Sequence, residues 1–317
     1  MPGVSVVVPA YHSARTLGEL VARLEPVLRA AADRFEVVLV NDGSRDATWT
    51  VIAQLRAQHS WVRGIDLIRN YGQHNALLCG IRSAVHDVIV TLDDDLQNPP
   101  EEIPKLLAAL APEVDVVYGA PLNEVHGLWR DLASQVGKIV LQGALGAETA
   151  RLVGPFRAFR AHIRRAFDDY RGSFVNIDVL LTWGTTRFRA VRVRHDPRGD
   201  GGSNYNFRRL LTHTLNMLTG FSAIPLQIAS VMGFALTLVG LALLAFVIGR
   251  YFFQGVAVPG FAFLASITII FSGAQLATLG IIGEYLARMH FRLMERPSYT
   301  VRSERAPSAS QPWNSRP

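Results

Sequence analysis

The stretch Val88-Ile89-Val90-Thr91-Leu92-Asp93-Asp94-Asp95 joins a short β-branched run directly to three carboxylates. Runs of this kind form buried strands, and the acidic residues mark the point where the strand ends. A second run, residues 35–41, ends in the same way at Asp42-Gly43-Ser44. In parallel sheets, ligands bind beyond the carboxyl ends of the strands. We therefore expect both polar clusters to lie near one another in a single crevice.

Strands and helices alternate around these two runs. Further strands are expected at residues 5–9, 62–66 and 115–118, and helices at residues 16–32, 47–59, 73–84 and 101–110. Alternation at this spacing predicts an α/β fold in which helices cover both faces of a mostly parallel sheet. Beyond residue 118 the pattern becomes irregular, with a helical stretch at 127–145 and strand-like stretches at 156–159 and 186–194.

Two long uncharged runs occupy the last third of the chain, at residues 226–248 and 261–282. As a helix, each is long enough to cross a hydrocarbon core of about 30 Å. Arginines precede the first run and follow the second, with only Arg250 between them. Both ends of this transmembrane hairpin are therefore expected on the cytoplasmic side. Residues 206–222 have helical spacing and predict an amphipathic interfacial helix, or a plain surface helix on the globular domain.

The expected domain organisation has four parts. These are a cytoplasmic catalytic domain at residues 1–205, the interfacial helix at 206–222, two transmembrane helices within 223–290, and a basic, partly disordered tail at 291–317. The N-terminus enters a strand pattern at once, without the features of a signal peptide. We therefore expect the catalytic domain to stay in the cytoplasm.

The composition narrows the class of partner. The 317 residues carry a net charge of +6 and a single cysteine, Cys79. One cysteine excludes an internal disulfide framework and a cysteine-rich metal site. The positive charge suits nucleic acid, anionic lipid or phosphate substrates. Because arginines gather beside the apolar runs and no stacking-aromatic module is apparent, we expect no nucleic-acid partner.

The triple aspartate indicates a cation site. Three adjacent carboxylates repel one another unless a positive partner is present. Hard oxygen ligands suit Mg²⁺ or Mn²⁺, which leave coordination positions open for the oxygens of a nucleotide diphosphate. Spacing alone leaves one alternative open, a solvated acidic loop that caps the helix after Pro99.

Four motifs follow one another along the chain. They are Val8-Pro9-Ala10-Tyr11, Val40-Asn41-Asp42-Gly43-Ser44-Arg45-Asp46, Arg69-Asn70-Tyr71-Gly72-Gln73-His74 and Leu92-Asp93-Asp94-Asp95-Leu96-Gln97-Asn98-Pro99-Pro100. In these, and in a Gly-x-Ser-x-Tyr match at residues 201–205, the chain resembles glycosyltransferase family 2. Within it, the resemblance is to the polyprenyl-phosphate glycosyltransferases, of the dolichol-phosphate mannose synthase type, and most to the bacterial undecaprenyl-phosphate 4-deoxy-4-formamido-L-arabinose transferases. It implies a GT-A-type, Rossmann-like catalytic domain with a two-helix transmembrane hairpin, in a multi-pass protein of the bacterial inner membrane.

The resemblance also implies a nucleotide-sugar donor and a metal cofactor, Mg²⁺ or Mn²⁺. The expected donor residues are Pro9, Tyr11 and Asp42 at the nucleoside, Asp93 at the ribose and diphosphate, Asp95 and Gln97 at the metal, and Arg198 and Ser203 in a loop over the diphosphate. This set is physically coherent because a metal and nearby cations stabilise the departing nucleoside diphosphate. Uridine is the expected base.

The acceptor that the resemblance implies is a polyprenyl phosphate, held by Arg130, Ser134 and Arg157. Arginine suits a phosphate because its planar fork donates two parallel hydrogen bonds. The expected catalytic set comprises Asp93, Asp95, Arg130, Arg157 and Arg198. The phosphate is already an anion, so no general base is assigned, and a single displacement inverts the anomeric carbon. A homo-tetramer is the expected oligomer.

The chain departs from the family pattern at three places. Asn41 stands where many relatives have an acid, Asn204 where lysine is common, and the residues around Gly154 lack a frequent acid. These changes affect the identity of the sugar more than the reaction class. Two alternatives stay open. One is a processive polysaccharide synthase-like transferase, although no Arg-Trp pair occurs in the chain. The other is a non-enzymatic lipid transporter or scaffold, although the spans offer no polar pathway.

Overall fold

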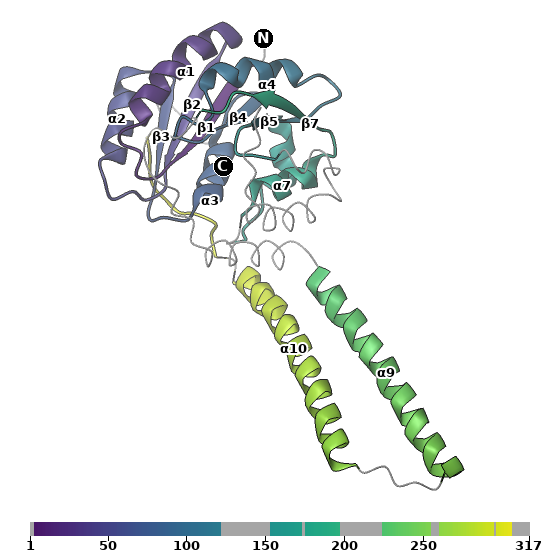
Figure 1. Ribbon diagram of the computed structural model, residues 1–317. Helices are drawn as coiled ribbons and strands as arrows, with labels where there is room; N and C mark the ends of the chain where they lie inside the picture. The colour runs from purple at the N-terminus through teal and green to yellow at the C-terminus, as the bar shows by residue number, and fades with distance from the viewer. Residues whose placement is uncertain are drawn as a thin grey trace, which may run out of the picture. The chain divides into compact units, whose positions relative to one another are not determined.

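The computed structural model describes residues 3–121, 153–172, 175–196, 224–254, 260–294 and 296–305. The chain divides into two compact units (Figure 1). The first contains the predicted catalytic domain and is called the catalytic unit; it comprises Met1–Tyr205 and Glu295–Pro317, and the second comprises Asn206–Met294. Four of the expected site residues lie outside the described residues, as does the predicted interfacial helix at 206–222. These four are Arg130, Ser134, Arg198 and Ser203.

The catalytic unit is built on an eight-stranded mixed sheet in the order β7-β5-β6-β4-β1-β2-β3-β8. The strands are β1 Val4–Ala10, β2 Phe35–Asn41, β3 Val62–Leu67, β4 Val88–Thr91, β5 Val116–Pro121, β6 Arg157–Arg160, β7 Phe188–Val193 and β8 Val301–Arg305. The β4-β1-β2-β3 half pairs in parallel, as does β5 with β7. Strand β6 runs antiparallel to both β4 and β5, and β8 runs antiparallel to β3. The predicted mostly parallel sheet is confirmed.

Helices cover both faces of the sheet, as predicted (Figure 1). One face carries α1 Leu17–Ala31, α2 Thr48–Gln58, the 3₁₀ turn η1 Pro100–Glu102 and α4 Ile103–Ala109. The other carries α3 Gln73–Ser83, the 3₁₀ turn η2 Ala161–Ala166 and α7 Ile177–Gly184. Successive strand residues point to opposite faces, so Val6 and Val8 enter the first core while Val7 enters the second. Burial on both faces explains why β1 and β4 are predominantly apolar rather than alternating.

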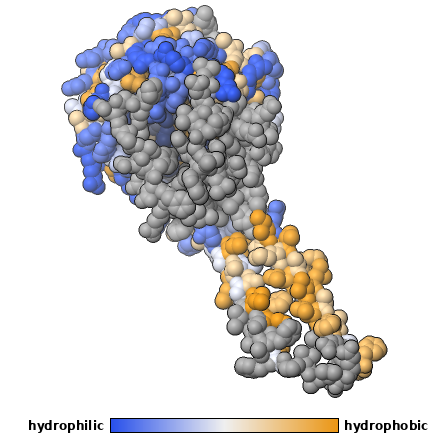
Figure 2. All heavy atoms as spheres, in the orientation of Figure 1, coloured by the Kyte–Doolittle hydropathy of each residue, from blue (hydrophilic) through white to orange (hydrophobic). Residues whose placement is uncertain are grey.

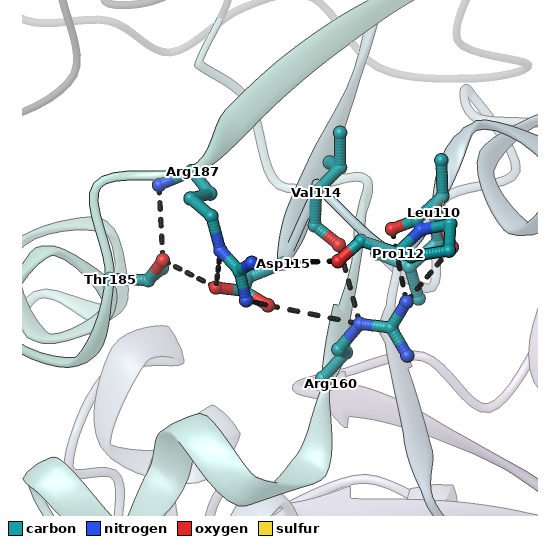
Figure 3. A network of polar contacts seen from close by, with 8 residues as sticks. Leu110, Pro112, Val114, Asp115, Arg160, Thr185 and Arg187 are labelled. Atoms are coloured by element: carbon teal, nitrogen blue, oxygen red, sulfur yellow. Dashed lines mark hydrogen bonds and ion pairs between the residues drawn. The ribbon is translucent and has the colours of Figure 1, made fainter.

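A polar network anchored on Asp115 joins the start of β5 to β6 and to the loop before β7 (Figure 3). The Arg187 guanidinium donates to both carboxylate oxygens of Asp115, at 2.8 Å each. The Thr185 hydroxyl donates at 2.6 Å, and Arg160 forms a longer ion pair at 3.8 Å. Burial by itself would raise the pKa of Asp115, but the hydrogen bonds from Arg187 and Thr185 outweigh it and hold that pKa below its ordinary value.

Strand β8 is a feature that the sequence analysis did not predict. Val301–Arg305 pairs with the edge of β3 in the expected tail region, and Ile68 N–H donates to the Thr300 carbonyl at 3.0 Å. This segment has one apolar residue among five and therefore lacks the alternation that marks a half-buried strand. Charged side chains of this kind are common on edge strands, which they protect against further pairing.

The second unit contains two long helices, α9 Ile224–Gln254 and α10 Phe261–Leu293, which are longer than the apolar runs that predicted them. Within them, Leu226–Leu243 and Ile270–Ala287 are long and apolar enough to cross a membrane. Their large side chains stay exposed, as Phe234 and Leu276 do, and apolar residues dominate the visible described surface of this unit (Figure 2). A Cβ added at Gly240 would lie 3.1 Å from Phe271, so the two helices approach closely there. Length, composition and exposure agree with the predicted hairpin.

Candidate functional site

A cavity of about 250 Å³ opens at the carboxyl ends of the neighbouring strands β4, β1 and β2. It is lined by Pro9, Ala10, Tyr11, Asp42, Asn70, Gly72, Gln73, Asp93, Asp94 and Asp95. Both polar clusters of the sequence therefore face one crevice, as the strand pattern predicts. Of the expected donor residues, Pro9, Tyr11, Asp42, Asp93 and Asp95 line this cavity, and Gln97 is not among the lining residues.

Asp42 is fixed in the wall of the cavity by backbone hydrogen bonds. Its two carboxylate oxygens accept from the N–H groups of Tyr71, at 2.7 Å, and Gly72, at 2.9 Å. Burial raises the pKa of Asp42, and the two backbone hydrogen bonds oppose that rise. The adjacent Gly43 has a φ of +65°, and a Cβ there would lie 2.3 Å from the Arg69 backbone. Only glycine permits this close approach of the two loops.

Asn41, which departs from the expected family pattern, is held by two side-chain hydrogen bonds. Its side-chain N–H donates to the Asp66 carboxylate at 2.7 Å, and its amide oxygen accepts from Ser44 N–H at 3.3 Å. Both Asn41 and Asp66 are buried. A carboxylate at position 41 would repel Asp66 and could not donate to it. An amide at position 41 therefore fits the buried carboxylate of Asp66 on the neighbouring strand.

Each carboxylate of the triple aspartate has a separate contact. Asp93 accepts from the Gln73 amide at 2.5 Å, Asp94 accepts from the Ser13 hydroxyl, and Asp95 accepts from Gln97 N–H at 3.2 Å. Burial, together with the negative charges of Asp95 and Asp94, raises the pKa of Asp93 to about 7. The site therefore concentrates negative charge that favours a cation.

The residues present fit a divalent metal that takes only part of its coordination from the protein. Among the described residues, no three His, Cys, Asp or Glu side chains form a metal-binding group by themselves. Mg²⁺ is commonly held by one or two carboxylates together with substrate phosphates rather than by an all-protein cage. The Asp95 carboxylate lines the cavity, and the Gln97 amide, two residues further along the same loop, is a second hard oxygen donor.

Arg157, one of the expected acceptor-phosphate residues, is not among the residues that line this cavity. Its side chain is 1% exposed and forms an ion pair with Asp178 at the start of α7. Asp178 also accepts from the Tyr118 hydroxyl at 3.1 Å, and Asn176 caps α7. The charge of Arg157 nevertheless favours the ionised form of Asp93. The structure thus places Arg157 behind the triple aspartate, in a buried network.

Sequence reasoning assigned no role to several residues that the structure brings to this site. Asn70, Gly72 and Gln73 line the cavity, and all three belong to the third quoted motif. Their position follows from the two hydrogen bonds to Asp42, which no local pattern encodes. The Gln97 carbonyl accepts from Asp196 N–H at 2.8 Å, so the aspartate loop also contacts the segment that precedes Arg198.

A mixed sheet with helices on both faces and an acidic cluster at the strand ends defines the GT-A class of fold. Solved structures support this class. Glucosyl-3-phosphoglycerate synthase from Mycobacterium tuberculosis, crystallised with Mn²⁺ and uridine diphosphate, has a TM-score of 0.52 at 16% identity over 69% of this chain and 78% of that one. Mannosyl-3-phosphoglycerate synthase from Rubrobacter xylanophilus has a TM-score of 0.51 at 16% identity over 82% of this chain and 78% of that one.

Residues 5–170 match the family model described as glycosyl transferase family 2, and the chain belongs to this family. Similar proteins extend the match over nearly the whole length. An undecaprenyl-phosphate 4-deoxy-4-formamido-L-arabinose transferase from Pectobacterium carotovorum subsp. carotovorum is 34% identical, over 98% of this chain and 95% of that protein. One of the same name from Pseudomonas paraeruginosa is 35% identical, over 96% of this chain and 92% of that protein. The family resemblance seen in the motifs is confirmed.

Proposed function

We propose that this protein transfers a sugar from a nucleotide-sugar donor, with uridine as the expected base, to a polyprenyl phosphate, with inversion at the anomeric carbon. The observation that carries the proposal is the acidic cavity at the strand ends in a chain that also has two membrane-length apolar helices. The names of the full-length relatives agree, since they state an undecaprenyl phosphate and a sugar. We place the hairpin in the bacterial inner membrane and the catalytic unit at its cytoplasmic face.

The donor binds in the cavity described above. Pro9 and Tyr11 contact the nucleoside, and Tyr11 is suited to this because half of its side chain is exposed at the opening. Asp42 accepts hydrogen bonds from the base through the lone pairs that Tyr71 and Gly72 leave free. Asp93 lies toward the ribose and diphosphate.

Asp95 and Gln97 would hold the divalent metal, Mg²⁺ or Mn²⁺. When bound, the metal supplies Lewis-acid stabilisation to the leaving diphosphate. Arg198 and Ser203 are proposed to contact the same diphosphate. In support of this assignment, Asp196 N–H, two residues before Arg198, donates to the Gln97 carbonyl at 2.8 Å.

The reaction is a single displacement. An oxygen of the lipid phosphate forms a bond to the anomeric carbon while the bond from that carbon to the diphosphate oxygen breaks, and the electron pair leaves with the nucleoside diphosphate. The attacking phosphate is already ionised, so no general base is required. We assign Arg130 and Ser134 to the acceptor phosphate. Arg157 is assigned to the same region, where its buried charge acts on Asp93 and on the incoming anion.

A donor panel tests this function. The full-length protein in detergent would be incubated with undecaprenyl phosphate, Mn²⁺ or Mg²⁺, and sugars activated by different nucleoside diphosphates, and the lipid extract analysed by mass spectrometry. We expect a glycosylated lipid phosphate with at least one donor, and its loss in Asp95→Asn. Folded wild-type protein that forms no glycosylated lipid with any donor would refute the proposal.

A further inference from the structure

The C-terminal strap, residues 296–305, packs on the catalytic unit close to the cavity wall. It follows the second apolar helix in sequence and contributes the edge strand β8. Its Ser298 is buried and donates to the Gly172 carbonyl at 2.8 Å, and its Thr300 carbonyl accepts from Ile68 N–H at 3.0 Å. The strap is therefore part of the folded catalytic unit.

One line of contacts leads from the strap through Tyr71 to Asp42. Thr300 is held beside β3 by Ile68 N–H, and burial of the Tyr71 phenol group is outweighed by Thr300 and Arg69, which hold its pKa below the ordinary value. The backbone N–H of Tyr71 donates to the Asp42 carboxylate at 2.7 Å. Tyr71 stands between Asn70 and Gly72, which both line the cavity. A displacement of Tyr71 would thus move the cavity wall on both sides of it.

A second line leads from Arg302 through Asp66 to Asn41. The Arg302 guanidinium donates to the Ile68 carbonyl at 2.9 Å and lies 3.7 Å from the Asp66 carboxylate. The Asp66 side chain is only 5% exposed, and it accepts from Asn41 at 2.7 Å. Asn41 directly precedes Asp42 on the strand that ends at the cavity. Arg302 therefore compensates a buried charge that orients the residue beside Asp42.

We propose that the C-terminal strap is a positioning element of the donor site, in which Thr300 and Arg302 hold Asp42 and residues 70–73 ready for the nucleotide. The inference rests on the proposed function, because it names the residues that set the affinity of the same cavity for a nucleoside diphosphate. Neither side chain lines the cavity, so both act through Tyr71 and Asp66. Loss of these contacts weakens donor binding more than turnover at saturating donor, because the chemical groups stay in place.

Binding of UDP tests the inference, with GDP run in parallel, by isothermal titration of the full-length protein with Mn²⁺. We expect Thr300→Val and Arg302→Ala each to raise the dissociation constant about threefold, and the double variant about tenfold, as for the loss of one and two partly exposed polar contacts. The donor KM should rise in parallel while kcat stays within about twofold. Arg302→Lys should restore part of the affinity, because it keeps the charge and loses only the planar fork.

Arg296→Ala is the matched control, because Arg296 is an exposed arginine of the same strap and should leave binding unchanged. Wild-type protein that binds neither nucleotide would overturn the proposed function and this inference with it. If the wild-type protein binds a nucleotide and the folded double variant binds it equally well, the inference alone is overturned. If circular dichroism shows that the double variant is unfolded, the test uses Thr300→Val instead, because this substitution removes a single hydroxyl group. Its nucleotide binding is then compared with that of the wild type in the same way.

Discussion

The buried ion pair between Arg157 and Asp178 offers a way to separate a structural role from a catalytic one. Arg157→Met removes the charge and keeps an unbranched apolar chain, but it leaves Asp178 without its cation. Loss of one partner of a buried pair costs about 3–5 kcal/mol. For a unit of this size, such a loss lowers the unfolding temperature by roughly 10 °C. We expect that shift in a thermal unfolding assay, because Arg157 is 1% exposed.

The double variant Arg157→Met/Asp178→Asn separates the two roles. The asparagine introduced by the second substitution carries no charge, yet its amide oxygen could still accept from the Tyr118 hydroxyl, which lies 3.1 Å from the native carboxylate. Most of the stability lost in Arg157→Met should therefore return. Transfer to the lipid should not return if Arg157 has its proposed role at the acceptor phosphate, because the positive charge that also acts on Asp93 is still missing. We expect transfer at least about tenfold below that of the wild type, equivalent to about 1.4 kcal/mol of transition-state stabilisation.

Two results would contradict this reasoning. A single Arg157→Met variant that unfolds at the wild-type temperature would show that the ion pair contributes nothing to stability. A double variant with wild-type kcat and wild-type KM for the lipid would show that Arg157 has a purely structural role. Asp115→Asn removes a charge from a separate network and serves as a control for general loss of stability.

Three further predictions concern the same unit. Asp42→Asn should raise the KM for the nucleotide sugar by roughly tenfold or more, measured in transfer kinetics. The NH₂ group of the new amide would face Tyr71 N–H or Gly72 N–H, and that buried N–H would lose its hydrogen-bond acceptor. Mn²⁺ with UDP should raise the unfolding temperature of wild-type protein but not of Asp95→Asn, because a ligand at about 100 times its dissociation constant contributes about 2.7 kcal/mol. Acid unfolding should be steeper in the wild type than in Asp115→Asn. The pKa of Asp115 lies below its ordinary 3.8, so its stabilisation is complete above that pH and is lost as the pH falls through the folded value.

The parallel half of the sheet was predictable because local pattern and tertiary environment agree there. Residues 35–41 were predicted as a strand and form β2 over the same residues. Burial on both faces selects apolar and often β-branched side chains at most positions, which gives a strong local signal. The neighbouring positions of the two polar clusters were predicted because both follow the carboxyl ends of parallel strands, and the structure places β4 and β2 on either side of β1.

Long-range contacts set the parts that the sequence did not predict. Helix α7, with its buried Asp178, and strand β8 lie in segments whose local pattern is irregular or charged. The pairing of Arg157 with Asp178 joins residues 21 positions apart, and that of Arg302 with Asp66 joins the last described strand to the third. An arginine can pair equally well with a phosphate or with a buried carboxylate. The residue type alone therefore did not show which of the two is the partner of Arg157.

The covalent structure of the lipid product tests the central claim most directly. Wild-type protein would be given undecaprenyl phosphate, Mn²⁺ and the donor that the panel selects, and the lipid product would be examined by phosphorus and proton NMR. The account predicts a phosphodiester between the lipid phosphate and the anomeric carbon, with the anomeric configuration opposite to that of the donor. Release of free sugar and nucleoside diphosphate without a lipid phosphodiester, or a product with the donor's configuration, would contradict it.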